Sequence, residues 1–378
     1  MTIWVVLMFL SLMLLLLMGY PVAFTSGAIA LVFGVIFLGI DFFTLLPLRI
    51  WGILTNFTLL AVPLFIFMGV ILDRSGIAED LLETMGKLFG KLNGGLALSV
   101  VIVGAMLAAT TGVVGATVVT MGIIALPTML KHNYSASLAS GTIAASGTLG
   151  QIIPPSIILI LLGDVMGVPV GRLFVGSIIP GLLLVTFFML YILIYAWHKP
   201  SVAPAFNLKQ NNFNYIGLIN TILPPLLLIL SVLGSIFLGI ATPTESAAVG
   251  AIGALILAAC HKKLTFINLQ ESMQQTMKLT SMVFMILIGA TAFGLVFRGM
   301  GGDKLVLDVM SSLPAGVWGF LFASMLLIFI LGFFLDFLQI CFIVIPILAP
   351  IATEFGIDLL WFAVLIAINL QTSFLTPP

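Results

Sequence analysis

The stretch GTLGQIIPPS, residues 147–156, interrupts a long apolar run near the middle of the chain. Pro154 and Pro155 lack amide donors, and each ring clashes with the turn before it, so a regular helix cannot continue through them. Inside a membrane, backbone groups freed in this way are tolerated only where they are buried in protein or line a polar cavity. In many secondary transporters such breaks hold ions and anionic substrates. The alternative interpretation of this stretch is a proline kink in a structural helix.

The chain ends in a second stretch of the same kind, NLQTSFLTPP, residues 369–378. Its two prolines follow the first pair by 223 residues, and the same offset recurs upstream. A constant offset over half the chain indicates a duplicated unit. Four pairs of identical residues share the offset: Pro154 and Pro377, Pro155 and Pro378, Pro127 and Pro350, and Gly27 and Gly250.

The composition indicates an all-helical, polytopic membrane protein. Hydrophobic residues make up 62% of the chain, charged residues only 7%, and the mean hydropathy is +1.33, whereas soluble proteins carry about 25% charged residues. A formal net charge of zero and the lack of a basic stripe argue against nucleic acid as a partner. The sequence has no catalytic triad, nucleotide-binding loop or Cys/His cluster, so we predict neither an enzyme nor transport driven by ATP on this chain.

We divide the sequence into two related units and a connection. Residues 1–155 form the first unit, with two spans, an amphipathic arm, a span, a second arm, a hairpin segment and the first half of a broken helix. Residues 156–214 contain the second half of that helix, a transmembrane helix and a polar cytoplasmic linker. Residues 215–378 repeat the first unit. The counterpart of residues 156–197 would follow Pro378, so we expect the unit to be truncated there and the chain as written not to transport.

The two arms, residues 74–93 and 264–279, combine apolar stripes with charges of both signs. This pattern is typical of helices that lie along a membrane surface. With the N-terminus outside, nine Lys and Arg residues fall on the cytoplasmic side and four outside, in agreement with the positive-inside tendency. The two units then enter from opposite faces, so the repeat is predicted to be inverted. The external residues are Arg49, Arg172, Arg298 and Lys304; the cytoplasmic ones are Arg74, Lys87, Lys91, Lys131, Lys199, Lys209, Lys262, Lys263 and Lys278.

Two interrupted segments, residues 110–115 and 333–338, are related by the same offset. Residues 94–130 carry no charge, and 37 residues barely suffice for two crossings and a turn. We therefore predict two re-entrant hairpins, with full-length helix pairs as the alternative.

Asp336 lies in the second hairpin segment, far from any polar flank. A carboxylate there is costly unless it is paired or binds a cation, so a coupling ion or a proton is the predicted partner. The alternative is that Asp336 caps a helix through backbone amides. For Glu245, which follows Thr242 and Thr244, a role at a helix N-terminus is the favoured interpretation.

Hydroxyl groups and free carbonyls at the breaks suit Na⁺, a hard cation that prefers oxygen ligands. Each threonine alone more often bonds a carbonyl of its own helix, but their placement at both breaks favours a functional role. The predicted Na⁺ ligands are Thr111, Gly112, Thr148 and Gly150 at the first break, and Asp336, Thr372 and Thr376 at the second. The predicted substrate contacts are Thr110, Gln151, Pro154 and Ser373.

The sequence resembles the large membrane subunit of TRAP transporters, the tripartite ATP-independent periplasmic transporters. The resemblance covers the whole chain and rests on GTLGQIIPPS (147–156), GIATPTESAAVG (239–250), FLD (334–336) and QTSFLTPP (371–378). One departure is the first hairpin tip, TTGVVG (110–115), where many members have a serine-rich SGSS-like tip.

This resemblance implies an elevator-type fold with scaffold and transport domains in the bacterial inner membrane. It also implies Na⁺-driven import of organic acid anions, C4-dicarboxylates among them, with no organic cofactor. The implied partners are a periplasmic substrate-binding protein and a small four-helix membrane subunit. A stand-alone Na⁺ or H⁺ symporter without a binding protein is the alternative within transport, and a passive channel or structural scaffold is the alternative outside it.

Overall fold

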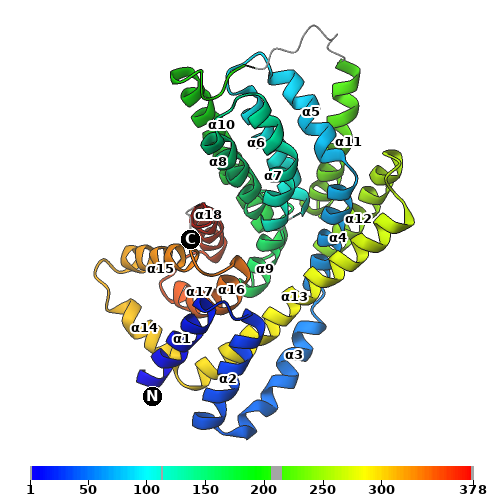
Figure 1. Cartoon of the computed structure of the whole chain (residues 1–378). Coiled ribbons are helices and arrows are strands. Elements are labelled where there is room, and N and C mark those ends of the chain that lie inside the picture. The colour runs from blue at the N-terminus through cyan, green and yellow to red at the C-terminus, as the bar shows by residue number, and fades with distance from the viewer. Residues whose placement is uncertain (1, 112–113, 206–214, 376–378) are drawn as a thin grey trace. The chain divides into compact units, whose positions relative to one another are not determined.

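A computed structural model of the protein describes residues 2–111, 114–205 and 215–375. Throughout these ranges the regular secondary structure is helical, without a strand (Figure 1). The helices group into two compact units, each assembled from separate parts of the chain. Unit 1 comprises Met1–Leu59, Ile160–Leu173 and Lys278–Pro378, and unit 2 comprises Leu60–Leu159 and Phe174–Met277.

Unit 2 is a helical bundle (Figure 1). Helix α4 packs along α12, and the three helices α6, α7 and α8 pack against one another. Gly250 of α12 allows α12 and α4 to pack closely. A Cβ at this position would lie only 2.6 Å from Sδ of Met68 in α4. The helices of this unit are α4 (Ala61–Arg74), α5 (Ile77–Phe89), α6 (Gly95–Thr111), α7 (Val114–Lys131), α8 (Ala136–Thr148), most of α10 (Val170–His198), α11 (Tyr215–Phe237), α12 (Pro243–Cys260) and the start of α13 (Phe266–Gly299).

Helix α5 is the amphipathic arm predicted in the first unit. Its apolar face, with Ile77, Leu81 and Met85, is buried, and α5 packs on α6 and α11. Leu88 and Leu92 are exposed further along. Much of the stripe that the sequence assigned to a membrane surface is therefore covered by protein.

The second predicted arm does not form a separate helix. Residues 266–279 belong to α13, which runs for 34 residues to Gly299 without interruption. No glycine or proline occurs in this segment before Gly289, so nothing in the backbone ends the helix between arm and span. The corresponding part of the first half is broken, because α3 ends at Leu54 and α4 begins at Ala61.

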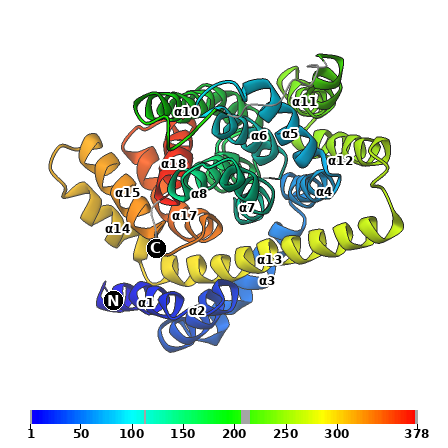
Figure 2. The ribbon, with the colours of Figure 1, turned by 45° about the horizontal axis from the view of Figure 1, so that its top comes forward.

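Unit 1 contains both ends of the described chain. Helix α1 packs on α2 and α14, and α15 packs on α18 (Figure 2). The helices are α1 (Thr2–Leu17), α2 (Val22–Leu38), the 3-10 helix η1 (Ile40–Leu45), α3 (Leu46–Leu54), most of α9 (Ile157–Met166), the end of α13, α14 (Gly302–Ser311), α15 (Val317–Leu331), α16 (Phe337–Gln339), the π-helix η4 (Ile340–Val344), α17 (Ile345–Glu354) and α18 (Leu359–Ser373).

Within the described ranges, five helices are long and apolar enough to span a bilayer. Large apolar side chains such as Ile179, Trp197 and Phe322 are exposed on helix surfaces, an arrangement that water disfavours and lipid favours. The chain is thus a multi-pass membrane protein. The five helices are Val170–His198, Gly217–Phe237, Pro243–Cys260, Phe266–Gly299 and Phe337–Glu354.

Candidate functional site: two helix breaks

The first break follows α8 in unit 2. The α-helix stops at Thr148, the 3-10 turn η3 covers Leu149–Gln151, and regular helix resumes only at Ile157. The peptide bond between Pro154 and Pro155 is cis. The sequence predicted this interruption, because neither proline can donate to the preceding turn.

Hydroxyl groups at this break are buried and hydrogen-bonded to nearby carbonyls. Thr148 Oγ1 donates to the carbonyl oxygen of Ala145 at 2.9 Å, and Ser156 Oγ donates to that of Gln151 at 3.0 Å. Gly150 is buried beside them. A hydroxyl group that donates its hydrogen can also act as an acceptor or a cation ligand through its oxygen, so these two bonds are compatible with ion binding. The sequence predicted a hydrogen bond from the Thr148 hydroxyl to the carbonyl four residues earlier, whereas the observed acceptor is three residues earlier. This bond does not prevent Thr148 from binding an ion.

Gln151 is the unusual residue of this break. Its side chain is 0% exposed, and neither Nε2 nor Oε1 has a hydrogen-bond partner in the described part of the chain. Leaving a buried amide unsatisfied costs about 1–3 kcal/mol for each missing bond. Gln151, a predicted substrate contact, is therefore a polar group that a bound ligand or water would satisfy.

A hairpin of two antiparallel helices, α6 and α7, packs against α8. Glycines bring the backbones together: a Cβ on Gly104 would lie 2.8 Å from Ser146 Oγ, and one on Gly147 would lie 2.4 Å from a Val118 methyl group. Helix α6 ends at Thr111, and α7 begins at Val114. The side chains of Thr110 and Thr111, and the whole of Gly112, lie outside the described residues.

In unit 1 the second hairpin turns between α15 and α16, and Asp336 is the N-cap of α16. The second break, residues 369–378, begins at the end of α18. Its Oδ1 accepts a hydrogen bond from the backbone N–H of Phe337 at 2.8 Å. The predicted alternative, helix capping, is thus observed. Capping occupies one carboxylate oxygen and is compatible with cation binding by the other.

The end of α18 meets this second hairpin. A Cβ on Gly332, at the end of α15, would lie 2.2 Å from Ser373 Oγ, and Asn369 Nδ2 donates to the Met325 carbonyl oxygen at 2.7 Å. The structure therefore brings Ser373 to the turn that leads into Asp336. Thr372 is exposed, with Oγ1 donating to the Asn369 carbonyl oxygen. Thr376 lies outside the described residues.

Comparison with known proteins decides the family. The model of the family "Tripartite ATP-independent periplasmic transporter, DctM component" matches residues 9–378. The chain belongs to this family. It is a large permease subunit of the TRAP type, a transporter subunit like its named DctM relatives and not an enzyme.

Three relatives illustrate the range of the family. The chain is 30% identical to the C4-dicarboxylate TRAP transporter large permease protein DctM of Pseudomonas aeruginosa, over 88% of this chain and 78% of that protein. It is 29% identical to the sialic acid TRAP transporter large permease protein SiaM of Vibrio cholerae, over 96% and 84%. It is also 29% identical to the isethionate TRAP transporter permease protein DctMQ of Oleidesulfovibrio alaskensis, over 97% and 57%.

A π-helix distinguishes the second hairpin of this TRAP permease from the first. Residues Ile340–Val344 adopt it directly after α16, whereas the first hairpin continues as the α-helix α7. Pro346 explains the difference, because it cannot donate to the carbonyl of Phe342 four residues earlier. Gln339, next to the π-helix, has an Oε1 atom without a hydrogen-bond partner among the described residues. Sequence analysis overlooked Gln339, although Pro346 was a signal of altered backbone nearby.

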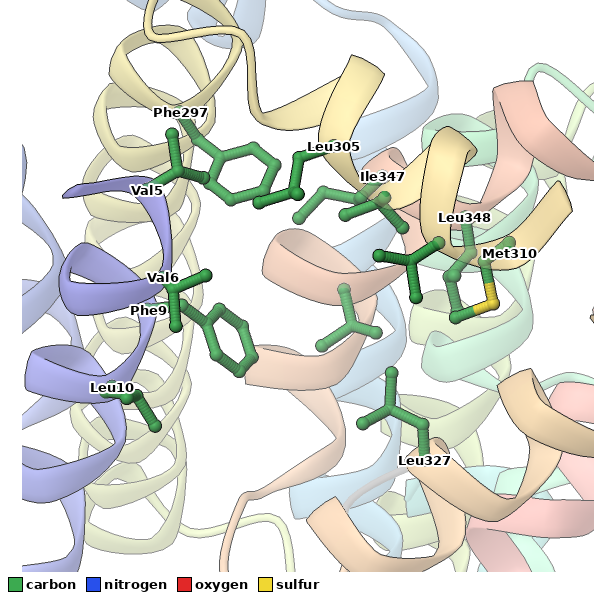
Figure 3. Close-up of a pocket in the computed structure, with 13 residues that line it drawn as sticks. Val5, Val6, Phe9, Leu10, Phe297, Leu305, Met310, Leu327, Ile347 and Leu348 are labelled. Atoms are coloured by element: carbon green, nitrogen blue, oxygen red, sulfur yellow. The ribbon is translucent and has the colours of Figure 1, made fainter. Parts of the chain in front are cut away.

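Two further features of the permease have structural roles. Thr242 and Glu245 form a capping box at the start of α12, with each side chain accepting a backbone N–H from the other residue. The predicted role of Glu245 at a helix N-terminus is confirmed. A cavity of about 290 Å³ in unit 1 is lined by apolar side chains, such as Phe9, Phe297 and Met310 (Figure 3). Such a lining offers no ligand for a cation or a carboxylate.

Proposed function

We propose that this permease imports small organic acid anions by Na⁺-coupled secondary transport, with substrate delivered by a periplasmic binding protein. The observation that carries the proposal is a pair of helix ends that bear hydroxyl groups, Thr148 of α8 and Thr372 and Ser373 of α18. Each of these ends packs against a helical hairpin, in a chain of the TRAP family. Broken helices in membrane transporters present carbonyl and hydroxyl oxygens to cations and helix N-termini to anions.

The proposed Na⁺ ligands divide between the two breaks. Oxygens of Thr111, Gly112, Thr148 and Gly150 would hold an ion at the first break; Asp336, Thr372 and Thr376 would hold one at the second. Buried Thr148 and Gly150 support the first set, and the free carboxylate oxygen of Asp336 supports the second. Among the described residues no group of three or more His, Cys, Asp or Glu side chains could hold a metal ion, and apart from Asp336 the proposed ligands are neutral oxygens.

The substrate class follows from the chemistry that the relatives' names share. C4-dicarboxylates, sialic acid and isethionate are all organic acid anions. Thr110, Gln151, Pro154 and Ser373 are the proposed contacts, and the unsatisfied amide of Gln151 is the strongest of them. A small membrane subunit and the inner membrane of a bacterium complete the proposed assembly.

Helix bounds support a duplicated unit, and the proposed inverted repeat, with its elevator movement of a transport domain against a scaffold, builds on this duplication. Helices α8 and α18 begin at Ala136 and Leu359, 223 residues apart. Helix α7 covers Val114–Lys131, and the segment from α16 to α17 covers Phe337–Glu354, again 223 residues later at both ends. The same offset that relates the prolines thus relates whole helices.

Uptake by proteoliposomes tests this function. The assembled transporter, with its small subunit, should accumulate a labelled dicarboxylate only when a Na⁺ gradient and the binding protein are both present. Uptake with Na⁺ but without binding protein would favour the stand-alone symporter instead. Flux that runs only down the substrate gradient and ignores Na⁺ would indicate a passive channel and contradict the proposal.

A further inference from the structure

A second cavity in unit 1, of about 550 Å³, is lined by both polar and apolar side chains. It lies among α3, the residues after α3, α9 and the last part of α13, all within unit 1. Neither helix break contributes to it. Its lining consists of Leu45, Leu48, Arg49, Gly52, Ile53, Asn56, Leu59, Asp164, Leu287, Thr291 and Arg298.

Two arginines of this cavity come from distant parts of the sequence. Arg49 lies on α3 and Arg298 in the last turn of α13, and both are exposed. No carboxylate among the described residues forms an ion pair with Arg49. Arg298 interacts electrostatically with Asp303 but forms no ion pair in the described part of the chain. Two guanidinium groups that form no ion pair among the described residues therefore line the same cavity.

Asp164, the acidic residue of the cavity, is hydrogen-bonded to a neutral side chain. Asp164 Oδ1 accepts a hydrogen bond from Asn56 Nδ2 at 2.6 Å, and Asn56 Oδ1 accepts one from the N–H of Thr58 at 2.9 Å. Asp164 forms no ion pair with either arginine within the described ranges. Two guanidinium groups and one carboxylate leave the cavity with a net charge of about +1.

The surroundings indicate what kind of anion would fit. Leu45 and Leu48 form an apolar edge, and Leu48 is 71% exposed. Arg298 ends a helix that is long enough to span the bilayer, which is the depth at which lipid head groups lie. Charge counting also assigned Arg49 and Arg298 to one face of the membrane, in agreement with their shared cavity.

We propose that this cavity binds an anionic phospholipid. The phosphate accepts hydrogen bonds from Arg49 and Arg298, which suit oxyanions through their planar donors. An acyl chain lies along the edge formed by Leu45 and Leu48. The hydrogen bond between Asn56 and Asp164 engages the carboxylate of the cavity, which lessens its competition for the arginines.

The test measures lipid binding to the purified chain by native mass spectrometry in neutral detergent. Dioleoyl phosphatidylglycerol should bind more tightly than dioleoyl phosphatidylcholine, which carries a phosphate but no net charge. Each lost arginine should weaken phosphatidylglycerol roughly fivefold, so R49Q and R298Q together should weaken it by about 25-fold. R172Q, an exposed arginine of α10 outside the cavity, should leave the affinity unchanged.

Two further arms keep the proposal falsifiable. The double variant with R49K and R298K retains both charges and should keep most of the affinity, which separates loss of charge from loss of fold. Glycerol 3-phosphate should bind far more weakly than the lipid. Equal affinity of wild type and the double glutamine variant would overturn the site, and arginine-dependent binding of glycerol 3-phosphate as tight as that of the lipid would assign it to soluble oxyanions instead.

Discussion

At the scale of single residues, the polar groups of the proposed binding sites differ in how they are satisfied. Asp336 and Thr148 each have a local hydrogen bond that explains them as structural residues. Gln151 has none in the described part of the chain, although its side chain is fully buried. Two kinds of variant therefore separate a functional role from a structural one. One kind preserves the local hydrogen bond, as at Asp336, and the other removes the unsatisfied amide of Gln151.

Gln151→Leu should raise thermal stability and abolish or strongly reduce uptake. Leucine has a similar volume and removes two buried unsatisfied atoms, so we expect a gain of about 1–3 kcal/mol in the free energy of unfolding. Thermal unfolding in detergent and proteoliposome uptake measure the two effects. Gln270→Leu, at an exposed position of α13, is the matched control and should change neither strongly. Loss of stability in Gln151→Leu would show that the amide is satisfied structurally.

Asp336→Asn should raise the Na⁺ concentration required for uptake while leaving stability nearly unchanged, because asparagine caps helices as well as aspartate does. Loss of a charged ligand costs about 2 kcal/mol and that of a neutral one about 1 kcal/mol, so Thr148→Ala should have the smaller effect. Asp358→Asn provides the control, since Asp358 caps α18 through a 2.8 Å bond from the N–H of Trp361. If both aspartate variants show the same Na⁺ dependence as wild type, Asp336 is only a cap.

Local chemistry made some residues predictable and left others hidden. The prolines at 154–155 and the Thr242–Glu245 pair act within one turn of the backbone, so the sequence shows their effect directly. Asn56 and Asp164 are 108 residues apart, and no local pattern indicates their contact. Gln151 was predicted as a contact, but only the structure shows that it lacks partners.

At the scale of elements, close packing between the first hairpin and α8 depends on glycine. Gly104→Ala would place a methyl group 2.5 Å from Cβ of Ser146, so the helices must separate. We expect a loss of about 1–3 kcal/mol in the free energy of unfolding, partly restored by Ser146→Gly in the double variant. Gly122→Ala is the control, because a Cβ there meets nothing within 4 Å and alanine favours a helix. Equal stability of the Gly104 and Gly122 variants would contradict this packing.

Helix boundaries were predictable only where a residue interrupts the backbone. The sequence predicted an interruption within residues 147–156 because of Pro154 and Pro155, and α8 ends in this stretch, at Thr148. It separated residues 264–279 from the next span on the basis of polarity, whereas the backbone of α13 continues through them to Gly299. Polarity decides where a helix lies relative to the membrane, but it does not end a helix.

At the scale of the whole molecule, the repeat relates α5 to α14. Lys304 of α14 follows Leu81 of α5 by 223 residues, and both helices are short and amphipathic. A direct repeat would place these two helices on the same side of the membrane, whereas an inverted repeat places them on opposite sides. The distinction is independent of which residues bind Na⁺.

Accessibility of single cysteines decides between the two arrangements. In a Cys260→Ser background, because Cys260 is exposed and Cys341 is buried, we expect Lys91→Cys and Lys278→Cys to react with an impermeant maleimide only from the cytoplasmic side. Lys304→Cys and Arg172→Cys should react only from outside. All four side chains are exposed, so failure to react reports the membrane side rather than burial. Labelling of Lys91→Cys and Lys304→Cys from the same side would exclude the inverted repeat, and the elevator movement proposed from it would lose its structural basis.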